Sequence, residues 1–241
     1  MRDSKLALAL AVLVALVGFV VPISAQDATK TVQNKIYLAE GEIDLIQFLP
    51  PPPANASVTT QKELNELLKW QLQRTPDQVA YAKADATITV FRFADVLGPA
   101  FNEASLPTTA SFFKDAIANV EMLIDYAKSY YHRTRPYVLD ARVQPVLAKP
   151  NNDSYPSGHS TAGHFIAIVL ADMIPEKAGE LYERGESFAQ NRVIGGVHYP
   201  TDLEAGKLSA TLIAERMFAS FEFRRDFERA RDELRKGLNL Q

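Results

Sequence analysis

The chain of 241 residues contains no cysteine and only four histidines. Without cysteine, the protein cannot form disulfides, thiolate metal sites or iron–sulfur clusters, and it cannot use a cysteine nucleophile. The scarcity of histidine means that any imidazole chemistry must come from a very short list of side chains. A net charge of -3 and a pI near 5.9 also leave the chain without the basic surface that non-specific nucleic-acid binding requires, so no nucleic-acid partner is expected.

The composition is that of a folded globular protein. Hydrophobic residues make up 47% of the chain and charged residues 23%, which is typical of neither a disordered nor a fibrous protein. The length suits one domain of ordinary size, or at most two small ones. After residue 25, the sequence has no uncharged apolar run of about 18 residues, so the mature protein is expected to be soluble and without a stable membrane anchor.

The first 25 residues have the pattern of a secretory signal peptide. Arg2 and Lys5 form a short basic region, and an uncharged apolar run from Leu6 to Val21 follows it. Pro22 to Ala25 then offers small residues for cleavage after Ala25, which predicts a periplasmic or secreted protein. The alternative is an uncleaved membrane anchor, because the apolar run is only slightly shorter than a membrane span.

The rest of the chain is expected to form a proline-rich arm at 26–59 and a helical domain at 60–241. The tetraproline Pro50 to Pro53 suits neither a helix nor a central strand and predicts a polyproline segment on the surface. In the domain, apolar residues recur at helical spacing and no series of alternating strands is evident, so the fold is predicted to be all-α, a single-domain helical bundle. Helices are predicted to begin at Thr60, with Thr59 or Thr60 as the N-cap, at Pro107 and at Pro200. Other helices are predicted over 76–98, over about 160–174 and from there to about 193, and a solvated terminal helix is predicted over 224–238. Residues 137–155 are predicted to form a loop.

The first chemically suggestive motif is Lys128-x6-Arg135-Pro136. Seven residues are close to two helical turns, so both cations can lie on one face, about 10 Å apart along the axis. Their long side chains can converge on one anion. Taken alone, two basic residues at this spacing more often form a solvated helix face.

The second motif is the pentapeptide from Tyr155 to His159, directly before the most apolar predicted helix. Gly158 permits a close approach of the backbone to a ligand, and the unpaired N–H groups of a helix start can bind an anion. Ser157 adds a hydroxyl donor, and His159 would lie at the mouth of this cradle. A capping turn that happens to contain histidine is the alternative.

The third motif is Arg192-x5-His198-x3-Asp202. His198 and Asp202 are one helical turn apart, so the carboxylate can accept a hydrogen bond from Nδ1–H and leave Nε2 able to attack an electrophile. By itself, such a pair is often only a local side-chain contact. Together, however, the three motifs supply three cations, an anion cradle and two histidines, which are the groups that phosphoryl transfer requires.

The order of these motifs resembles the type 2 phosphatidic acid phosphatase (PAP2) superfamily, which includes bacterial class A non-specific acid phosphatases, membrane lipid phosphatases and vanadium haloperoxidases. The secreted class A acid phosphatases are the most similar group, because they share a signal peptide, the arm from Leu49 to Pro53 and the Ser-Tyr-Pro-Ser-Gly-His sequence. The resemblance extends from about Tyr37 to Ser220. Asn191 and Asp153 depart from the family pattern, which usually has serine and often glycine at these positions.

The resemblance implies a role for each motif residue. His198 would be the nucleophile, forming a phosphohistidine, Asp202 would orient it, and His159 would protonate the leaving group and then activate water. The phosphoryl oxygens would be held by Lys128, Arg135, Ser157, Gly158 and Arg192. No metal and no cofactor are expected, because the cations replace a metal ion.

The resulting expectation is a secreted, metal-independent acid phosphatase that acts on small phosphate monoesters and is inhibited by phosphate or vanadate. A lipid phosphate or diphosphate phosphatase and, less favoured, a vanadium-dependent haloperoxidase are the alternatives, and a homo-oligomer is possible by analogy. Of the other histidines, His164 is expected to have a packed or hydrogen-bonded core role. His132 is placed only as a candidate for the pocket rim.

Overall fold

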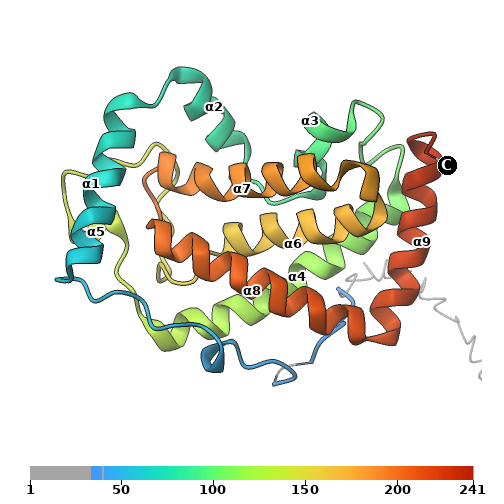
Figure 1. Cartoon of the computed structure of the whole chain (residues 1–241), viewed down its shortest axis with the longest axis horizontal. Coiled ribbons are helices and arrows are strands. Elements are labelled where there is room, and N and C mark those ends of the chain that lie inside the picture. Colours follow the sequence, from blue (N-terminus) through green and yellow to red (C-terminus); the bar gives the residue numbers. More distant parts are fainter. Residues whose placement is uncertain (1–33, 40, 241) are drawn as a thin grey trace, which may run out of the picture. The chain divides into compact units, whose positions relative to one another are not determined.

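A computed structural model describes residues 34–39 and 41–240 of the chain. The predicted signal peptide and the first part of the arm lie outside the described residues. The described residues form helices joined by loops and contain no β-strand (Figure 1), which confirms the all-α prediction. The α-helices are α1 (Val58–Gln73), α2 (Pro76–Ala84), α3 (Ala94–Leu97), α4 (Pro107–Tyr131), α5 (Pro136–Leu139), α6 (Gly158–Met173), α7 (Ala178–Ile194), α8 (Pro200–Ala219) and α9 (Phe221–Gly237), with short 3-10 turns at Leu45–Gln47, Val90–Phe93 and Pro175–Lys177.

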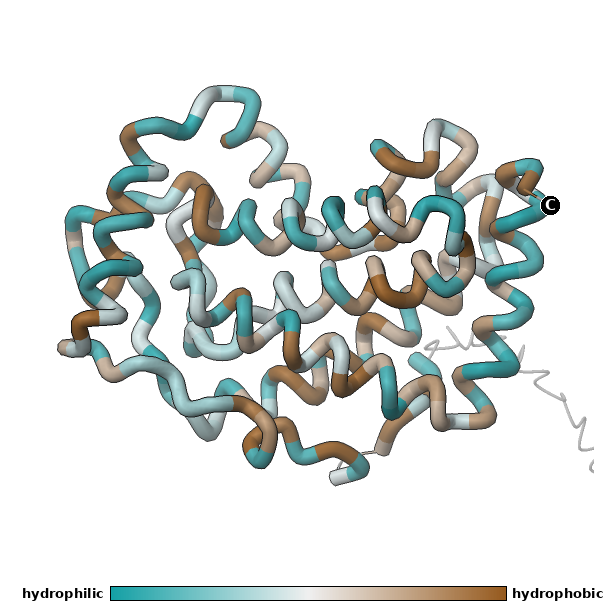
Figure 2. Tube along the Cα trace, in the orientation of Figure 1, coloured by the Kyte–Doolittle hydropathy of each residue, from teal (hydrophilic) through white to brown (hydrophobic). Residues whose placement is uncertain are grey.

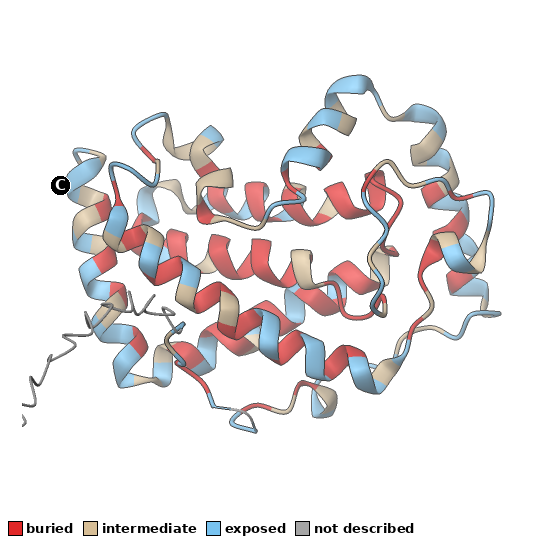
Figure 3. Cartoon of the chain, turned by 180° about the vertical axis from the view of Figure 1, so that it is seen from behind, coloured by how far each residue is buried: buried red, intermediate tan, exposed pale blue. Residues whose placement is uncertain are grey.

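Helix α6 is the centre of the fold. Nearly all of its residues are buried (Figure 3), and it packs against α7, α8 and α4. Glycines let α6 and α7 approach closely: a Cβ atom on Gly185 would lie 2.8 Å from the Cβ atom of Ala167 and 3.2 Å from the carbonyl oxygen of Gly163. This close packing fixes the start of α6 against the last turns of α7, where Arg192 lies.

Helix α8 is held equally close to the start of α6. A Cβ atom on Gly206 would lie 2.7 Å from the Cβ atom of Ser160 and 2.8 Å from the carbonyl oxygen of Ser157. The backbone N–H of Ser157 also donates to the carbonyl oxygen of Asp202, at 3.0 Å. The second and third sequence motifs are therefore joined through their backbones.

Helix α9 differs from its prediction as a solvated tail. It begins at Phe221, and Phe223, Phe227, Ala230 and Leu234 form a buried stripe that packs on α4. The charged residues lie on the opposite face, so hydrophilic and hydrophobic positions alternate along this helix (Figure 2). The amphipathic spacing lets a strongly charged segment contribute to the core.

Two other helix predictions need correction. The first helix begins at Val58 and is capped by Ser57, whose Oγ accepts a hydrogen bond from the N–H of Thr60, so neither Thr59 nor Thr60 is the cap. The single helix predicted over 76–98 is interrupted after Ala84, because the side chain of the next residue turns inward to bind arginines. The loop predicted at 137–155 also contains part of the short helix α5.

The described part of the arm contributes to the core. Tyr37, Leu38, Leu45 and Leu49 are buried, and the Tyr37 ring packs edge-on against Phe223. The stretch from Pro50 to Pro53 is exposed or half-buried, as expected for a polyproline segment on the surface.

Candidate active site

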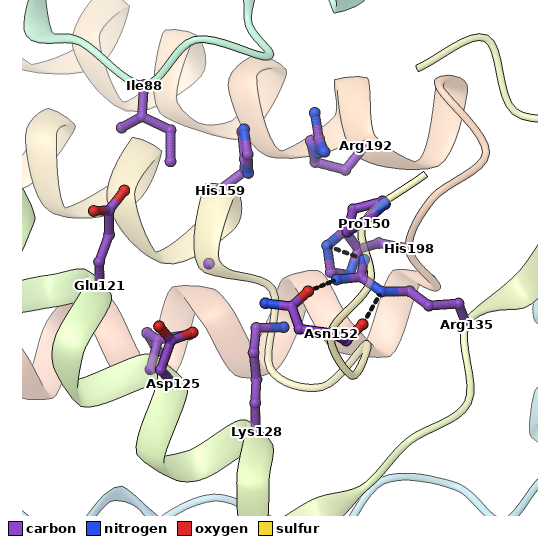
Figure 4. Close-up of a pocket in the computed structure, with 12 residues that line it drawn as sticks. Ile88, Glu121, Asp125, Lys128, Arg135, Pro150, Asn152, His159, Arg192 and His198 are labelled. Carbon is purple, nitrogen blue, oxygen red and sulfur yellow. Dashed lines mark hydrogen bonds between the residues drawn. The ribbon is translucent and has the colours of Figure 1, made fainter. Parts of the chain in front are cut away.

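A pocket of about 250 Å³ opens at the start of α6, and all three motifs contribute to it (Figure 4). Its walls come from α4, from the segments between α4 and α6, from α6 and α7, and from the loop before α8. Of the eight predicted site residues, six line the pocket: Lys128, Arg135, Gly158, His159, Arg192 and His198. Asp202 and Ser157 are fully buried behind it.

His198 and Asp202 form the pair that their spacing predicts. His198 Nδ1 lies 3.0 Å from Asp202 Oδ2, and both side chains are buried. The other ring nitrogen, Nε2, accepts a hydrogen bond from Arg135 Nη1 at 2.8 Å, which requires that the proton is on Nδ1. Burial, reinforced by the charge of Arg135, lowers the pKa of His198 well below its ordinary value, so the imidazole is neutral and its Nε2 lone pair faces the pocket.

Asp202 is fixed by more than the histidine. Its Oδ2 accepts hydrogen bonds from the N–H of Tyr199 at 2.9 Å and from Ser154 Oγ at 2.5 Å, and its Oδ1 accepts one from Arg133 Nη1 at 2.6 Å. Burial by itself raises the pKa of Asp202, but the hydrogen bonds and the charge of Arg133 outweigh it and hold that pKa below its ordinary value. The carboxylate is therefore ionised at any pH at which a phosphatase works.

Arg133 extends this network to α1. Its Nη2 donates to Glu63 Oε2 at 2.7 Å, its guanidinium stacks over the Tyr199 ring at 4.0 Å, and Glu63 Oε1 accepts from both the N–H and the hydroxyl of Thr201. Sequence reasoning missed Glu63, Arg133, Ser154 and Thr201. Two of them gave a signal: Arg133 lies two residues before Arg135 within the first motif, and Ser154 begins the Ser-Tyr-Pro-Ser-Gly-His sequence.

The first-motif cations enter the pocket from different directions. Arg135 Nε and Nη2 donate to the carbonyl and side-chain oxygens of Asn152, and Nη1 also donates to the carbonyl of Val197 at 2.8 Å. Lys128 Nζ donates to the carbonyl of Asp153 at 2.7 Å. Burial and the nearby charge of Arg135 lower the pKa of Lys128 to about 7, so this ammonium is poised to gain from a bound anion.

Arg192 is a buried pocket residue with hydrogen-bond donors that other described residues do not satisfy. Its side chain is 3% exposed, and its Nε and Nη1 atoms find no hydrogen-bond partner within the described part of the chain. Burial, followed by the charge of Arg135, lowers its pKa to about 10, and it remains a cation. A buried guanidinium with two unused donors that faces a pocket is the group expected to bind an oxyanion.

The second motif forms the start of α6. Gly158 lines the pocket with the positive end of the helix dipole, as predicted for an anion cradle. Ser157 instead caps the helix: its Oγ accepts a hydrogen bond from the N–H of Ser160 at 3.3 Å. The predicted contact between Ser157 and phosphate therefore stays a prediction, whereas its role in ending the loop is evident.

His159 lies at the pocket with a protonation state that differs from expectation. Its Nε2 lies 3.0 Å from the carbonyl oxygen of Ala86, to which it donates, and its ring stacks on Phe188. Burial, together with the charges of Arg192, Arg135 and Lys128, lowers the pKa of His159 to about 3. The resemblance implies that His159 donates a proton to the leaving group, whereas in the unliganded protein a pKa of about 3 keeps this imidazole neutral near pH 7.

A buried carboxylate fixes the segment that contacts His159. Asp85 is completely buried and accepts hydrogen bonds from Arg92 Nε, from both Nη atoms of Arg184 and, at 2.8 Å, from Asn191 Nδ2. Asn191 is one of the two departures from the family pattern, and its amide ties the end of α7 to this carboxylate. The carbonyl of the next residue, Ala86, is thereby held against His159.

The remaining predicted positions lie outside the pocket. Asp153 is the second departure from the family pattern. Its carboxylate lies 3.0 Å from His132 Nδ1 at the surface. The carboxylate therefore points away from Lys128, whose Nζ donates to the backbone carbonyl of the same residue. His132 is exposed at the end of α4 and does not line the pocket. His164 is buried, with Nδ1 at 2.8 Å from the carbonyl of Ser160, which agrees with the expected hydrogen-bonded core role.

The chemistry available at this pocket is transfer of an anionic group. Three buried cations and a helix start can hold a dianion, and a neutral, carboxylate-backed imidazole can attack it. Among residues 34–39 and 41–240, no group of three or more histidine, aspartate or glutamate side chains is arranged to hold a metal ion.

Comparison with known sequences agrees with this interpretation. A model of the PAP2 superfamily matches residues 113–226, which include all three motifs. The chain is 30% identical over 234 residues to the non-specific acid phosphatase of Salmonella typhimurium, and the match covers 93% of this chain and 94% of that protein. It is also 30% identical over 204 residues to the acid phosphatase of Zymomonas mobilis, covering 80% of this chain and 76% of that one.

Among solved structures, the fold is similar to one described as the first bacterial vanadium-dependent iodoperoxidase, with a TM-score of 0.56 and 20% sequence identity. The match covers 74% of this chain and 54% of that chain, so this chain spans about half the length of the protein it matches. At this level of identity the likeness concerns the fold alone.

Proposed function

The chain belongs to the PAP2 superfamily, and on this premise we propose that it is an acid phosphatase that hydrolyses phosphate monoesters with His198 as the nucleophile. The single observation that carries the proposal is the convergence of Lys128, Arg135 and Arg192 on the pocket that His198 also lines; two Arg192 donors, Nε and Nη1, have no partner in the described part of the chain. The names of the similar proteins support the same reaction class.

In the first step, His198 Nε2 attacks phosphorus, and the bond between phosphorus and the ester oxygen breaks. Before the attack, Arg135 Nη1 exchanges its hydrogen bond to Nε2 for one to a phosphoryl oxygen. Asp202 stabilises the positive charge that develops on the imidazole, since it accepts the Nδ1–H bond throughout. His159 gives a proton to the departing oxygen, which leaves as an alcohol.

In the second step, neutral His159 takes a proton from a water molecule, which attacks the phosphohistidine from the side that the alcohol has vacated. The bond between phosphorus and Nε2 breaks, and inorganic phosphate leaves. Throughout, Lys128, Arg135 and Arg192 neutralise the equatorial oxygens, so the site itself supplies the charge that a metal ion supplies in other phosphatases. Metal independence is thus part of the proposal.

Export to the periplasm or the medium is also part of the proposal. The basic region, apolar run and small residues within 1–25 support it. In the part of the chain that the structure describes, no helix is long and apolar enough to cross a membrane.

The proposal is tested by assaying the full mature chain with a chromogenic phosphate monoester. Turnover is expected to persist in excess chelator, because protein cations hold the phosphoryl group, and to be inhibited by vanadate, which mimics the five-coordinate transition state. Loss of activity in chelator that returns on adding a divalent metal would contradict the proposed site chemistry. Halide oxidation by the vanadate-loaded protein with peroxide would favour a haloperoxidase instead.

The pH dependence should report how His159 obtains its proton. Because its pKa is about 3 in the free protein, the proton must enter with the monoanionic ester, and the bound dianion then raises the pKa of His159. We expect kcat/KM to fall about tenfold per pH unit above the second pKa of the substrate phosphate, near 6. His198 stays neutral until the pH falls well below the ordinary pKa of histidine, so protonation of His198 lowers the rate only on the acid side.

The measurement is a set of pH profiles for an alkyl and a nitrophenyl ester, whose second phosphate pKa values differ. The alkaline limb of kcat/KM should move with the substrate's pKa. A limb at the same pH for both esters would mean that a protein group, and not the substrate, carries this ionisation.

A further inference from the structure

Two carboxylates on the pocket wall have no part in the proposed mechanism. Glu121 and Asp125 lie one turn apart on α4, on the same face as Lys128, and both line the pocket. Neither one makes a hydrogen bond or an ion pair with any other residue among those that the structure describes. Both side chains are exposed to solvent, and the charge of Asp125 also acts on Lys128, so the two carboxylates give this side of the pocket a negative, partly solvated wall.

The pair is held in an unfavourable electrostatic state. Like charges four residues apart on a helix repel each other. Partial burial and the neighbouring Asp125 raise the pKa of Glu121, so a cation nearby would favour its ionised form. A cation placed between the two carboxylates would relieve both effects.

An independent feature fixes where the phosphoryl group binds. Arg192 and His198 line the same pocket, and the buried Nε and Nη1 atoms of Arg192 have no hydrogen-bond partner among the described residues, so an oxyanion is the expected ligand there. In an in-line displacement, the leaving group lies on the side of phosphorus opposite the nucleophile. Figure 4 shows His198 and Arg135 on one side of the pocket and, on the opposite side beyond His159, the labelled side chains of Ile88, Glu121 and Asp125.

We propose that the preferred substrates are phosphate esters of amino alcohols, whose ammonium group binds between Glu121 and Asp125 while the phosphoryl group binds at Arg192. This inference rests on the proposed phosphatase function and assigns its leaving-group specificity. Ile88 and Ile124 offer apolar surface to the carbon chain that joins the two charges. A pocket of about 250 Å³ suits a small ester of this kind. An ester whose alcohol carries a carboxylate or a second phosphate is disfavoured, because that negative charge would lie beside Glu121 and Asp125.

The test compares three esters that differ in charge at the distal end of the alcohol. Choline phosphate carries a cation there, 3,3-dimethylbutyl phosphate is its neutral isostere, and phosphoglycolate carries an anion. We expect kcat/KM to decrease about tenfold from each ester to the next in this order. The reason is the interaction energy of the distal charge with two partly solvated carboxylates a few ångströms away. The three esters are compared at one pH, near neutrality.

A double substitution tests whether the carboxylates of Glu121 and Asp125 cause this preference. Glu121→Gln with Asp125→Asn keeps the side-chain shapes and removes both charges, so both ratios of kcat/KM should approach one. The matched control is Glu103→Gln with Asp172→Asn, which removes two exposed carboxylates that do not line the pocket. The control should keep the ratios of the wild-type protein.

The outcomes separate this inference from the function on which it rests. If the wild-type protein hydrolyses all three esters with equal kcat/KM, or if the double variant keeps the wild-type ratios, the inference is wrong and the phosphatase function stands. If none of the three is hydrolysed, nor the chromogenic ester, the proposed function fails, and this inference fails with it.

Discussion

Replacing His198 by alanine is expected to lower kcat by about four orders of magnitude or more, because the variant lacks the atom that forms the covalent intermediate. The cations and the helix start remain, so the variant should still bind phosphate. Rapid-quench kinetics with a radiolabelled ester is the measurement. The wild-type protein should yield a labelled adduct that is labile in acid and stable in base, as a phosphorus–nitrogen bond requires, and His198→Ala should yield none.

Two results would contradict this assignment. Unchanged turnover in His198→Ala would mean that the pocket is not used for covalent catalysis. An adduct stable in acid would identify a hydroxyl nucleophile, and Ser157, at the start of α6, would be the first residue to test. Because His198 is buried, thermal unfolding of the variant must be compared with that of the wild-type protein, so that loss of activity is not confused with loss of fold.

The Asp202→Asn variant is expected to lose about 10³- to 10⁴-fold in kcat. An amide NH₂ group facing His198 can donate to Nδ1, which favours the tautomer with its proton on Nε2 and removes the lone pair that attacks phosphorus. The binding of phosphate, which depends on Lys128, Arg135 and Arg192, should change much less than kcat does. Steady-state kinetics and phosphate inhibition measured on the same preparation separate the two effects.

The control for Asp202→Asn is Ser154→Ala. Ser154 donates to the same carboxylate oxygen, but its removal leaves the tautomer of His198 unchanged, so a loss of about tenfold or less is expected. Equal losses in the two variants would indicate that Asp202 acts only by holding the loop and not by orienting the imidazole. The isosteric asparagine also leaves Arg133 without one anionic partner, so the stability of both variants should be measured by urea unfolding.

The sequence predicts those parts of the site that depend on local helix geometry. His198 lies two residues before the start of α8 and Asp202 lies in its first turn, so the four-residue spacing brings the two side chains into contact at this helix start. The proline, serine and glycine before His159 likewise determine a helix start without reference to the rest of the fold. These local rules account for the contact between His198 and Asp202 and for the helix start at Gly158, whereas the meeting of the three motifs in one pocket depends on how the helices pack.

Local rules give no information about partners that come from distant segments. Arg133 meets Glu63 across 70 residues, and His159 meets the carbonyl of Ala86 across 73. The break after Ala84 has the same origin: a buried ion pair between Asp85 and Arg184 outweighs the helix-forming tendency of an alanine-rich segment. The amphipathic face of α9 could be read from its apolar spacing, but only packing on α4 shows that this face is covered.

By itself, then, the sequence predicted the helical class and the three motifs, since these follow from spacing along one chain. The family resemblance, and not the spacing, assigned the attacking and phosphate-holding side chains, and that assignment stays a prediction. Only the tertiary structure decided the charge state of the site. Burial at the start of α6, and the gathering of three cations there, hold His159 neutral, and the same packing places the carboxylates of Glu121 and Asp125 on the pocket wall. The pKa of a side chain depends on solvent exclusion and on charges brought close by folding, and neither can be read from a linear pattern.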